Sequence, residues 1–289
     1  MRHLLFIIFS ALISTSILAN RIDSLKTDSD VVEFLKNTNA DFRSEKFNKI
    51  ELRSTETVRQ DLNCDGIADK WQVKNWEKAD FNGDGRTDLA VMLYWYDYGV
   101  YVVMDNGNND YKLHTLSYNI YEKCELAKPL ASNGQQWLLF SEKKNIDTLA
   151  YKYGGFVEMS RQPANYAIDS VEFRTGFCYG NCPVFTIKFD KNGHAEYDAG
   201  TYNPKQGKFF TTLQKDKLDA IVGLINYLSV RQLNDDYKVK WTDDQTAWLR
   251  VRFADGTIKE IKDYGLKGTF GLRLIYSIFF DLRGNQDWK

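Results

Sequence analysis

The sequence predicts an α+β protein in which a β-rich unit is followed by a compact α+β domain. Apolar, β-branched and aromatic runs separated by turn residues dominate the first half, as expected for short strands. The second half shows the order strands, helix, strands, helix, which indicates a mostly antiparallel sheet with helices packed on it. A hydrophobic content of 43% with 27% charged residues is typical of a folded globular chain rather than a disordered one.

The first 19 residues have the order of a secretory signal peptide. Arg2 and His3 form a short polar start, residues 4–18 are mostly apolar, and Ala19 is the small residue expected at a cleavage site. The apolar run is shorter than the ~20 residues that a membrane-spanning helix needs. An uncleaved anchor is the alternative. We therefore expect export to the periplasm, the cell surface or the medium, with no membrane span after cleavage.

The region after the signal peptide, residues 20–160, is expected to form one β-rich domain. A short helix is predicted over residues 30–36, where apolar residues form a partial stripe. The rest, residues 58–158, is interpreted as strand-like. Strands are predicted over residues 89–94, 99–104, 111–116 and 136–141. The Asn- and Gly-rich stretch 105–110 predicts a tight turn between two of them.

The second domain is expected over residues 161–289, with the boundary near Pro163. Strands are predicted over residues 170–174, 184–189, 195–197, 247–253 and 258–261. Asn192-Gly193 and Asp255-Gly256 supply the positive φ angles that tight hairpins require. Apolar residues at helical spacing predict a helix over residues 218–228, and a last helix is predicted over 270–282 with Gly284 suited to its end.

Two Asp-rich stretches repeat one spacing of oxygen-bearing groups. The first supplies, at positions 1, 3, 5, 7 and 9, Asp61, Asn63, Asp65, the carbonyl of Ile67, and Asp69. The second supplies Asp80, Asn82, Asp84, the carbonyl of Arg86, and Asp88. Calcium takes about six to eight oxygens at about 2.3–2.6 Å, and alternate residues of a tightly coiled loop provide them. Gly66 and Gly85 allow the turn at position 6. The spacing predicts one or two structural Ca²⁺ ions, and the alternative is a pair of Asp-rich turns without an ion.

Neither loop has the bidentate Glu that closes an EF-hand at position 12, because Gln72 and Val91 stand there. Asp69 and Asp88 are expected to close the sites instead. The second loop runs directly into a strand, and in this it resembles the calcium loops of FG-GAP and VCBS-type repeats. The resemblance covers residues 58–116 and implies a secreted or cell-surface protein. Because the loops are 19 residues apart and no further copies follow, we expect one small β-rich calcium-loop unit rather than a propeller.

Four cysteines in an exported chain indicate disulfides. They allow three pairings, of which sequence proximity favours Cys178 with Cys182 and leaves Cys64 with Cys124. A bridge between cysteines four residues apart requires a tight turn, and Gly180 makes such a turn easy. A redox site more typically shows Cys-x-x-Cys, and a zinc site needs two more ligands. A structural disulfide is therefore favoured over a redox or metal role.

The stretch 177–183 reads Phe-Cys-Tyr-Gly-Asn-Cys-Pro and precedes an apolar strand. It resembles the Cys-aromatic-Gly-x-Cys-Pro motif of a bacterial family of uncharacterised domains. The resemblance extends over residues 168–280. It bears on the fold of this half and implies no activity, because none is attached to that family.

The sequence shows none of the motifs G-x-S-x-G, H-E-x-x-H or a phosphate-binding Gly-rich loop. His114 and His194 are interpreted as ordinary surface or packed residues rather than ligands. A formal charge of −1 argues against a nucleic-acid partner recognised by bulk charge. The expected function is therefore non-catalytic calcium binding combined with binding or envelope interaction. The alternative is a hydrolase of an extracellular polymer, whose acidic catalytic residues the pattern does not single out.

The aromatic run 94–101 is the candidate binding surface. Alternation in a strand places Tyr94, Tyr96 and Tyr98 on one face. If that face is exposed, its flat rings with polar edges suit a glycan or an envelope protein. Cross-strand aromatic packing inside the sheet is the alternative.

Overall fold

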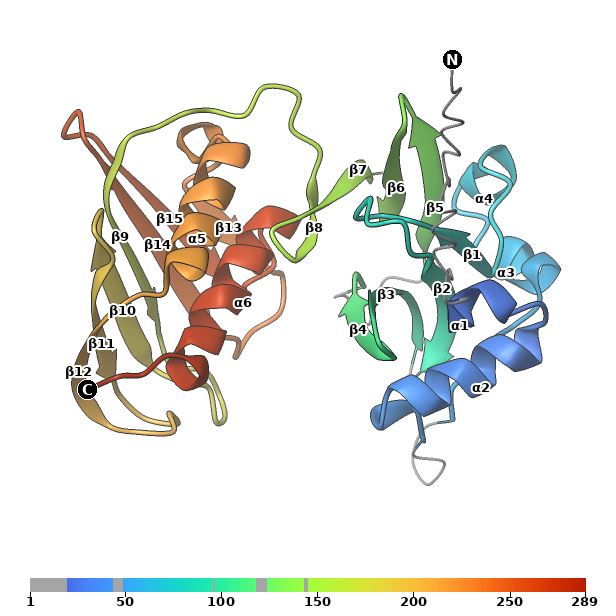
Figure 1. Ribbon diagram of the computed structural model, residues 1–289, viewed down its shortest axis with the longest axis horizontal. Helices are drawn as coiled ribbons and strands as arrows, with labels where there is room; N and C mark the ends of the chain where they lie inside the picture. The colour runs from blue at the N-terminus through green and yellow to red at the C-terminus, as the bar shows by residue number, and fades with distance from the viewer. Residues whose placement is uncertain (1–19, 44–48, 96, 118–123, 143–144) are drawn as a thin grey trace, which may run out of the picture.

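The computed structural model describes residues 20–43, 49–95, 97–117, 124–142 and 145–289, so the predicted signal peptide lies outside the described residues. The chain folds into two halves (Figure 1), the first with two four-stranded sheets and the second with one seven-stranded sheet. Within these described residues, no helix is long and apolar enough to cross a membrane. The predicted α+β class is confirmed.

Short helices come before the first sheet. They are α1 (Arg21–Ser24), α2 (Asp28–Thr38), the 3-10 turn η1 (Asp41–Arg43), α3 (Thr55–Asp61) and α4 (Ile67–Lys70). Helix α2, predicted over 30–36, begins earlier because Thr27 and Asp30 form a capping box, each accepting the backbone N–H of the other. The strand-like interpretation is wrong for α3 and α4. Ser54 caps α3, and Gly66 with φ of 85° begins α4, so local capping decides these segments.

The first sheet has the order β1-β2-β3-β4 with antiparallel neighbours. Its strands are β1 (Trp76–Ala79), β2 (Asp88–Trp95), β3 (Asp97–Gly107) and β4 (Asp110–Thr115). Strand β2 is buried on both faces. Ala90 and Met92 pack toward the second sheet, whereas Leu89, Val91 and Leu93 pack toward helices α1 and α2. This explains why the strand reads as a continuous apolar run rather than an alternating one.

The second sheet is an antiparallel meander in the order β5-β6-β7-β8. Its strands are β5 (Glu125–Ser132), β6 (Gln135–Glu142), β7 (Asn145–Lys152) and β8 (Gly155–Glu158). Leu138 and Phe140 of β6 share one buried cluster with Met92 and Val102 of the first sheet. The two four-stranded sheets therefore bury their apolar faces against each other.

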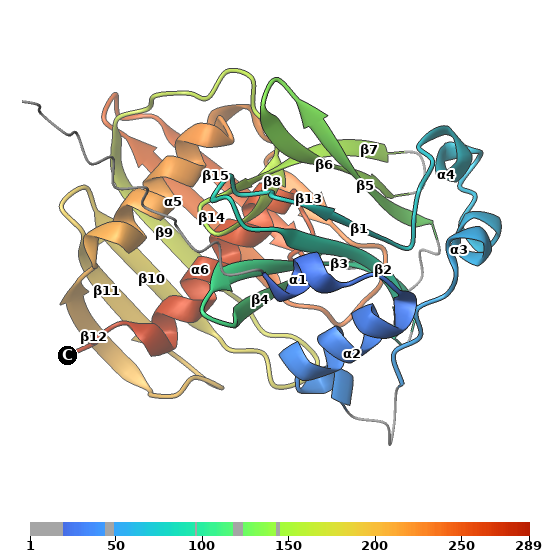
Figure 2. The same ribbon diagram turned by 45° about the vertical axis from the view of Figure 1, so that its right-hand side comes forward.

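The C-terminal half contains a seven-stranded sheet in the order β12-β11-β10-β9-β14-β15-β13. All neighbours are antiparallel except β13 and β15. The strands are β9 (Ile168–Thr175), β10 (Phe185–Asp190), β11 (His194–Ala199), β12 (Gly207–Thr212), β13 (Asp236–Lys238), β14 (Thr246–Phe253) and β15 (Ile258–Tyr264). The helices are α5 (Lys215–Tyr227), η2 (Val230–Gln232) and α6 (Phe270–Asn285). Both views show α5 and α6 on the same face of this sheet (Figures 1 and 2).

The sheet and its two helices enclose the core of this half. Phe173 of β9 stacks on Phe279 and Tyr276 of α6, with ring centroids 4.8 and 5.3 Å apart. Helix α6 runs to Asn285, so Gly284 lies inside it and does not end it at 282 as predicted. The outward residues of β10, β11 and β14 alternate with the buried ones and are polar or half-exposed. One face of the sheet is thus covered by helices, and the opposite face is open to solvent.

The two halves meet where β8 reaches the beginning of α6. Glu158 accepts the backbone N–H groups of Phe270 and Gly271, the latter at 2.9 Å. A carboxylate at this place satisfies free N–H groups and the positive end of the helix dipole. Phe270 also packs edge-on against Phe140 of the second sheet, with ring centroids 5.2 Å apart.

Candidate functional site

The second predicted calcium loop joins β1 to β2 and coils around the carboxylate of Asp80. Its two oxygens accept the N–H groups of Gly83 at 2.7 Å and Gly85 at 2.8 Å. Asn82 Oδ1 accepts the N–H of Asp84 at 3.1 Å. Gly83 and Gly85 have φ of 76° and 82°, which only glycine adopts easily. The loop therefore coils tightly around the Asp80 carboxylate.

Asp88 closes this loop from the buried side. It is 0% exposed, and its oxygens accept the N–H groups of Phe81 and Asp105, each at 2.9 Å. Burial, with smaller contributions from the charges of Asp80 and Asp84, raises the pKa of Asp88 to about 7, although the two backbone hydrogen bonds act to lower it. A bound cation would reduce the electrostatic repulsion between Asp88 and the neighbouring carboxylates.

The donors of the second loop are carboxylate, amide and carbonyl oxygens, which are the ligands that calcium prefers. Within the part of the chain that is described, however, no group of three or more His, Cys, Asp or Glu side chains is gathered closely enough to hold a metal. Arg86 Nη1 lies 2.9 Å from Asp84 Oδ2 and competes for that carboxylate. The chemical type of the donor groups thus suits calcium. Their present positions do not form a metal site, so an ion would have to draw these groups closer together.

The first predicted loop is arranged differently, because Asp61 is the last residue of α3 and Ile67 and Asp69 lie in the short helix α4. Asp61 bonds to the guanidinium of Arg53 and accepts the hydroxyl of Tyr98 at 3.2 Å, so this carboxylate has other partners. Cys64 and Asp65 both adopt positive φ, of 54° and 59°. The sequence does not reveal the pairing of Asp61, because Arg53 and Tyr98 reach it through tertiary structure. The Asp61 carboxylate is therefore engaged by side chains from outside its loop, whereas the Asp80 carboxylate bonds to backbone N–H groups within its own loop.

Both predicted disulfides are present, and the described cysteines include no free thiol. Cys64 joins Cys124 with a Cα–Cα distance of 5.5 Å, and Cys178 joins Cys182 at 5.8 Å. Both distances lie in the range that disulfide geometry requires.

The segment 176–183, which we call the aromatic loop, is closed at its base by buried hydrogen bonds. The Gln245 side chain is buried and donates to the carbonyls of Gly176 and Pro183 at 2.8 and 2.7 Å. Thr175 Oγ1 also donates to Pro183 at 2.7 Å. Further out, Tyr179 donates its N–H to the carbonyl of Asp243 at 3.1 Å. With the disulfide, these contacts hold the loop in one conformation.

The aromatic loop presents two rings to solvent. Phe177 is 71% exposed and Tyr179 is 87% exposed, more than the other large apolar side chains in the described residues. Tyr202 is also exposed and lies on the neighbouring turn, which is joined to the base of the loop by the Val184 N–H and the Thr201 carbonyl. This surface was not predicted from the sequence. The signal present in the sequence was that Phe177 and Tyr179 flank Cys178, the first cysteine of a short disulfide loop.

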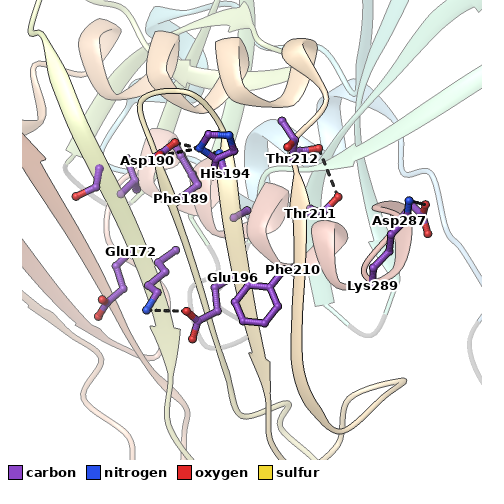
Figure 3. Close-up of a pocket in the computed structure, with 14 residues that line it drawn as sticks. Glu172, Phe189, Asp190, His194, Glu196, Phe210, Thr211, Thr212, Asp287 and Lys289 are labelled. Carbon is purple, nitrogen blue, oxygen red and sulfur yellow. Dashed lines mark hydrogen bonds and ion pairs between the residues drawn. The ribbon is translucent and has the colours of Figure 1, made fainter.

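A hollow of about 950 Å³ lies on the open face of the seven-stranded sheet, and we call it the sheet trough (Figure 3). Its side chains come from β9, β10, β11, β12 and the C-terminal residues. They include Ser170, Glu172, Lys188, Asp190, His194, Glu196, Phe210, Thr212, Asp287 and Lys289. Phe210 is 57% exposed and is surrounded by polar groups. This surface was also not identified from the sequence.

Ion pairs fix the charged side chains of the sheet trough. Glu196 lies 2.9 Å from Lys188 and 3.6 Å from Lys208, and the hydrogen bond from Lys188 lowers the pKa of Glu196. His194 Nδ1 lies 3.0 Å from Asp190 Oδ2. Burial opposes a downward shift of the Asp190 pKa, but hydrogen bonds from His194 and the backbone outweigh it.

The two histidines occupy different positions, one packed and one exposed. His114 packs edge-on against the rings of Tyr151 and Phe156, with centroids 5.5 and 5.7 Å away. Burial lowers its pKa to about 4, so it is neutral at physiological pH. His194 is an exposed residue beside a turn.

The aromatic run 94–101 packs within the fold where it is described; residue 96 is outside the described residues. Tyr101 is buried, and Trp95 packs edge-on against Phe42 with centroids 5.3 Å apart. Tyr94 and Tyr98 form an edge-to-face pair at 5.7 Å. The run is therefore mainly a packing element, and the partner predicted for an aromatic surface stays a prediction.

Comparison with known families finds one match, over residues 169–282, to a domain of unknown function (DUF6438). The matched segment begins in β9 and ends in α6, so it covers the seven-stranded sheet and its helices. It agrees with the predicted resemblance of this half to an uncharacterised domain family. The resemblance of the first half to FG-GAP repeats receives no support and stays a prediction. No curated protein and no solved structure matches the chain.

Proposed function

We propose that this protein is an exported, non-catalytic calcium-binding protein that binds a protein of the cell envelope through its aromatic loop. The observation that carries the proposal is the exposure of Phe177 and Tyr179 on a loop held by a disulfide and by buried Gln245. Exposing two rings costs hydrophobic free energy that burial in a partner recovers.

The rigidity of the aromatic loop supports a binding role. A flexible loop loses conformational entropy when it binds, whereas a loop already fixed in one shape avoids most of that cost. Aromatic side chains are the residues that most often dominate interface energies, usually by filling a pocket in the partner. Because the two rings project from a short turn, the complementary surface is a concave apolar pocket on another protein.

Export is proposed from two independent features. The first residues have the order of a signal peptide, and the chain contains two disulfides, which persist in oxidising compartments. Calcium is abundant outside the cell, where sites with dissociation constants of about 10⁻⁴ to 10⁻³ M still fill. In the second loop an ion would be held by Asp80, Asn82, Asp84, Asp88 and the carbonyl of Arg86, and would brace the connection between β1 and β2.

Removing both rings is expected to abolish capture of the envelope partner. The mature protein, immobilised, is incubated with detergent-solubilised envelope proteins, and the captured proteins are identified by mass spectrometry. Proteins captured by the wild type are expected to be lost with the Phe177→Ala/Tyr179→Ala variant. They should be retained with Ile146→Ala, which removes an exposed apolar side chain from β7. Equal capture by the wild type and the double variant would rule out the aromatic loop as the contact.

Calcium is expected to stabilise the mature protein against heat. At a calcium concentration 100 times the dissociation constant, the free energy of unfolding rises by about 2.7 kcal/mol. The Asp80→Ala variant should lose this increment, because Asp80 organises the second loop. Asp65→Ala tests the first loop in the same way. Calorimetric titration and the melting temperature with calcium or chelator measure both effects, and a wild type that gives neither heat nor a shift would disprove calcium binding.

A hydrolase is the second candidate, favoured by the three carboxylates of Glu172, Asp190 and Glu196 in the sheet trough. Polymer hydrolysis by paired carboxylates requires one group that is protonated at working pH, which means a raised pKa. The pKa values of Asp190 and Glu196 are shifted downward instead. These shifts favour binding over hydrolysis at the trough.

A further inference from the structure

The open face of the seven-stranded sheet carries an ordered row of side chains across neighbouring strands. In register, Phe210 of β12 lies beside Glu196 of β11, which lies beside Lys188 of β10 and then Glu172 of β9. The row continues to Arg250 of β14. An exposed aromatic ring is therefore followed by alternating negative and positive groups, as Figure 3 shows for the part that lines the sheet trough.

We propose that the sheet trough binds a chain of uncharged sugar rings, with one ring stacked on Phe210 and its hydroxyl groups bonded to the row of charged side chains. This site is separate from the aromatic loop and has a different ligand. It therefore does not depend on the partner proposed for that loop.

The chemistry of the trough selects an uncharged polyhydroxylated ligand. One face of a sugar ring consists of C–H groups, which pack on the negative face of an aromatic ring. Each hydroxyl group both donates and accepts a hydrogen bond, so it matches a surface where a carboxylate and an ammonium alternate. Nucleic acids and polyanions need an excess of positive charge. The trough instead pairs Glu196 with Lys188 and Lys208, and His194 with Asp190.

The backbone of Phe210 is held from both sides. Its strand pairs with β11 on one side. On the other side the C-terminal residue pairs with it: Phe210 donates its N–H to the Lys289 carbonyl at 2.8 Å, and Lys289 donates its N–H to Phe210 at 3.0 Å. Trp288 anchors this tail because it is buried and its Nε1–H donates to the Leu282 carbonyl at 2.7 Å. The ring thus stands on a braced backbone.

The size of the trough agrees with an oligosaccharide. A volume of about 950 Å³ lies within the ~300–1,000 Å³ range of small-ligand sites. Because the trough lies on a sheet face and is not enclosed, a polymer chain can enter and leave it at both ends. An open site of this kind is suited to internal segments of a glycan.

The test is isothermal titration of the mature protein with uncharged pentasaccharides (cellopentaose, chitopentaose and laminaripentaose) and with polygalacturonate as the charged contrast. At least one uncharged probe should bind the wild type. Phe210→Leu keeps an apolar side chain but removes the flat ring, and it should weaken binding tenfold or more. Phe210→Trp keeps a flat ring and should restore it. Ile258→Ala, which alters an exposed apolar residue on β15 at the far side of the same sheet, should leave affinity unchanged.

Three results would overturn the inference: no binding of any uncharged probe, equal affinity of Phe210→Leu and wild type, or preference for polygalacturonate. An assay of reducing ends during the titration detects hydrolysis. Release of reducing ends would show that the trough is a catalytic site and would overturn the proposal of a binding site. The Phe177→Ala/Tyr179→Ala variant should bind the pentasaccharide with unchanged affinity. Failure of the aromatic-loop proposal and failure of the trough proposal are therefore distinguished by the same set of proteins.

Discussion

Replacing Cys64 and Cys124 by serine is expected to lower the free energy of unfolding by about 4 kcal/mol. The bridge joins residues that are 60 positions apart, so in the unfolded chain it closes a long loop and removes much conformational freedom. It also ties the connection between α3 and α4 to the residue that precedes β5. The bridge therefore adds a covalent link to the buried contacts that Leu62 and Ala68 already share with the second sheet.

Urea unfolding followed by circular dichroism measures this loss. The matched control is the Cys178→Ser/Cys182→Ser variant, in which the broken bridge spans only four positions. The same entropy argument gives about 2 kcal/mol for it. We expect the long bridge to contribute more stability than the short one. An equal or reversed order would mean that the bridges act mainly through the folded state and not through the unfolded chain.

The parts of the fold that were predictable are those where a local pattern, or a small number of alternatives, limits the choice. Strands β2, β3, β6, β9 and β14 were expected because apolar and β-branched residues continue or alternate over the length of a strand. Cys64 and Cys124 were paired by elimination, and the structure contains that pair. The helix α3 was missed because its beginning depends on the single side chain of Ser54, and a short capped helix has too few residues for a periodic pattern.

The candidate sites were predictable only where neighbouring residues in the sequence form them. The second predicted calcium loop is a local structure, because Asp80 bonds to residues only three to five positions away. Asp61 instead bonds to Arg53 and Tyr98, which tertiary structure brings to it. The exposure of Phe177 and Phe210 depends in the same way on which strands and loops surround them. Composition alone identified aromatic residues but not which of them face solvent.

The stability of the protein is expected to fall by about 3 kcal/mol between pH 4.5 and pH 7 because of Glu125. This residue begins β5 and is 2% exposed, and among the described residues its Oε2 has no hydrogen-bond partner. Burial raises its pKa from 4.5 to about 7. A hydrogen bond from Ser117 and the charge of Arg273 lower the pKa, whereas the charges of Glu142 and Asp97 raise it.

The direction of the effect follows from proton binding. Below pH 4.5 the folded and unfolded states both hold the proton, so the contribution of Glu125 to stability is complete. As the pH rises toward 7, the unfolded chain releases its proton first and the folded state retains it, which favours unfolding. Above pH 7 both states are ionised. The loss of stability then levels off at about 1.4 kcal/mol for each unit by which the folded-state pKa exceeds the unfolded-state pKa.

The Glu125→Gln variant removes the ionisation and keeps the shape of the side chain. Its free energy of unfolding should equal that of the wild type near pH 4.5 and exceed it by about 3 kcal/mol at pH 8. Asp88, whose pKa is also raised to about 7 by burial, titrates in both proteins and cancels in the difference. Glu260→Gln, at an exposed position on β15, is the matched control and should show no such difference. If Glu125→Gln instead reproduced the wild-type pH profile, Glu125 would have to be ionised in the folded state, with its charge compensated by a cation such as Arg273.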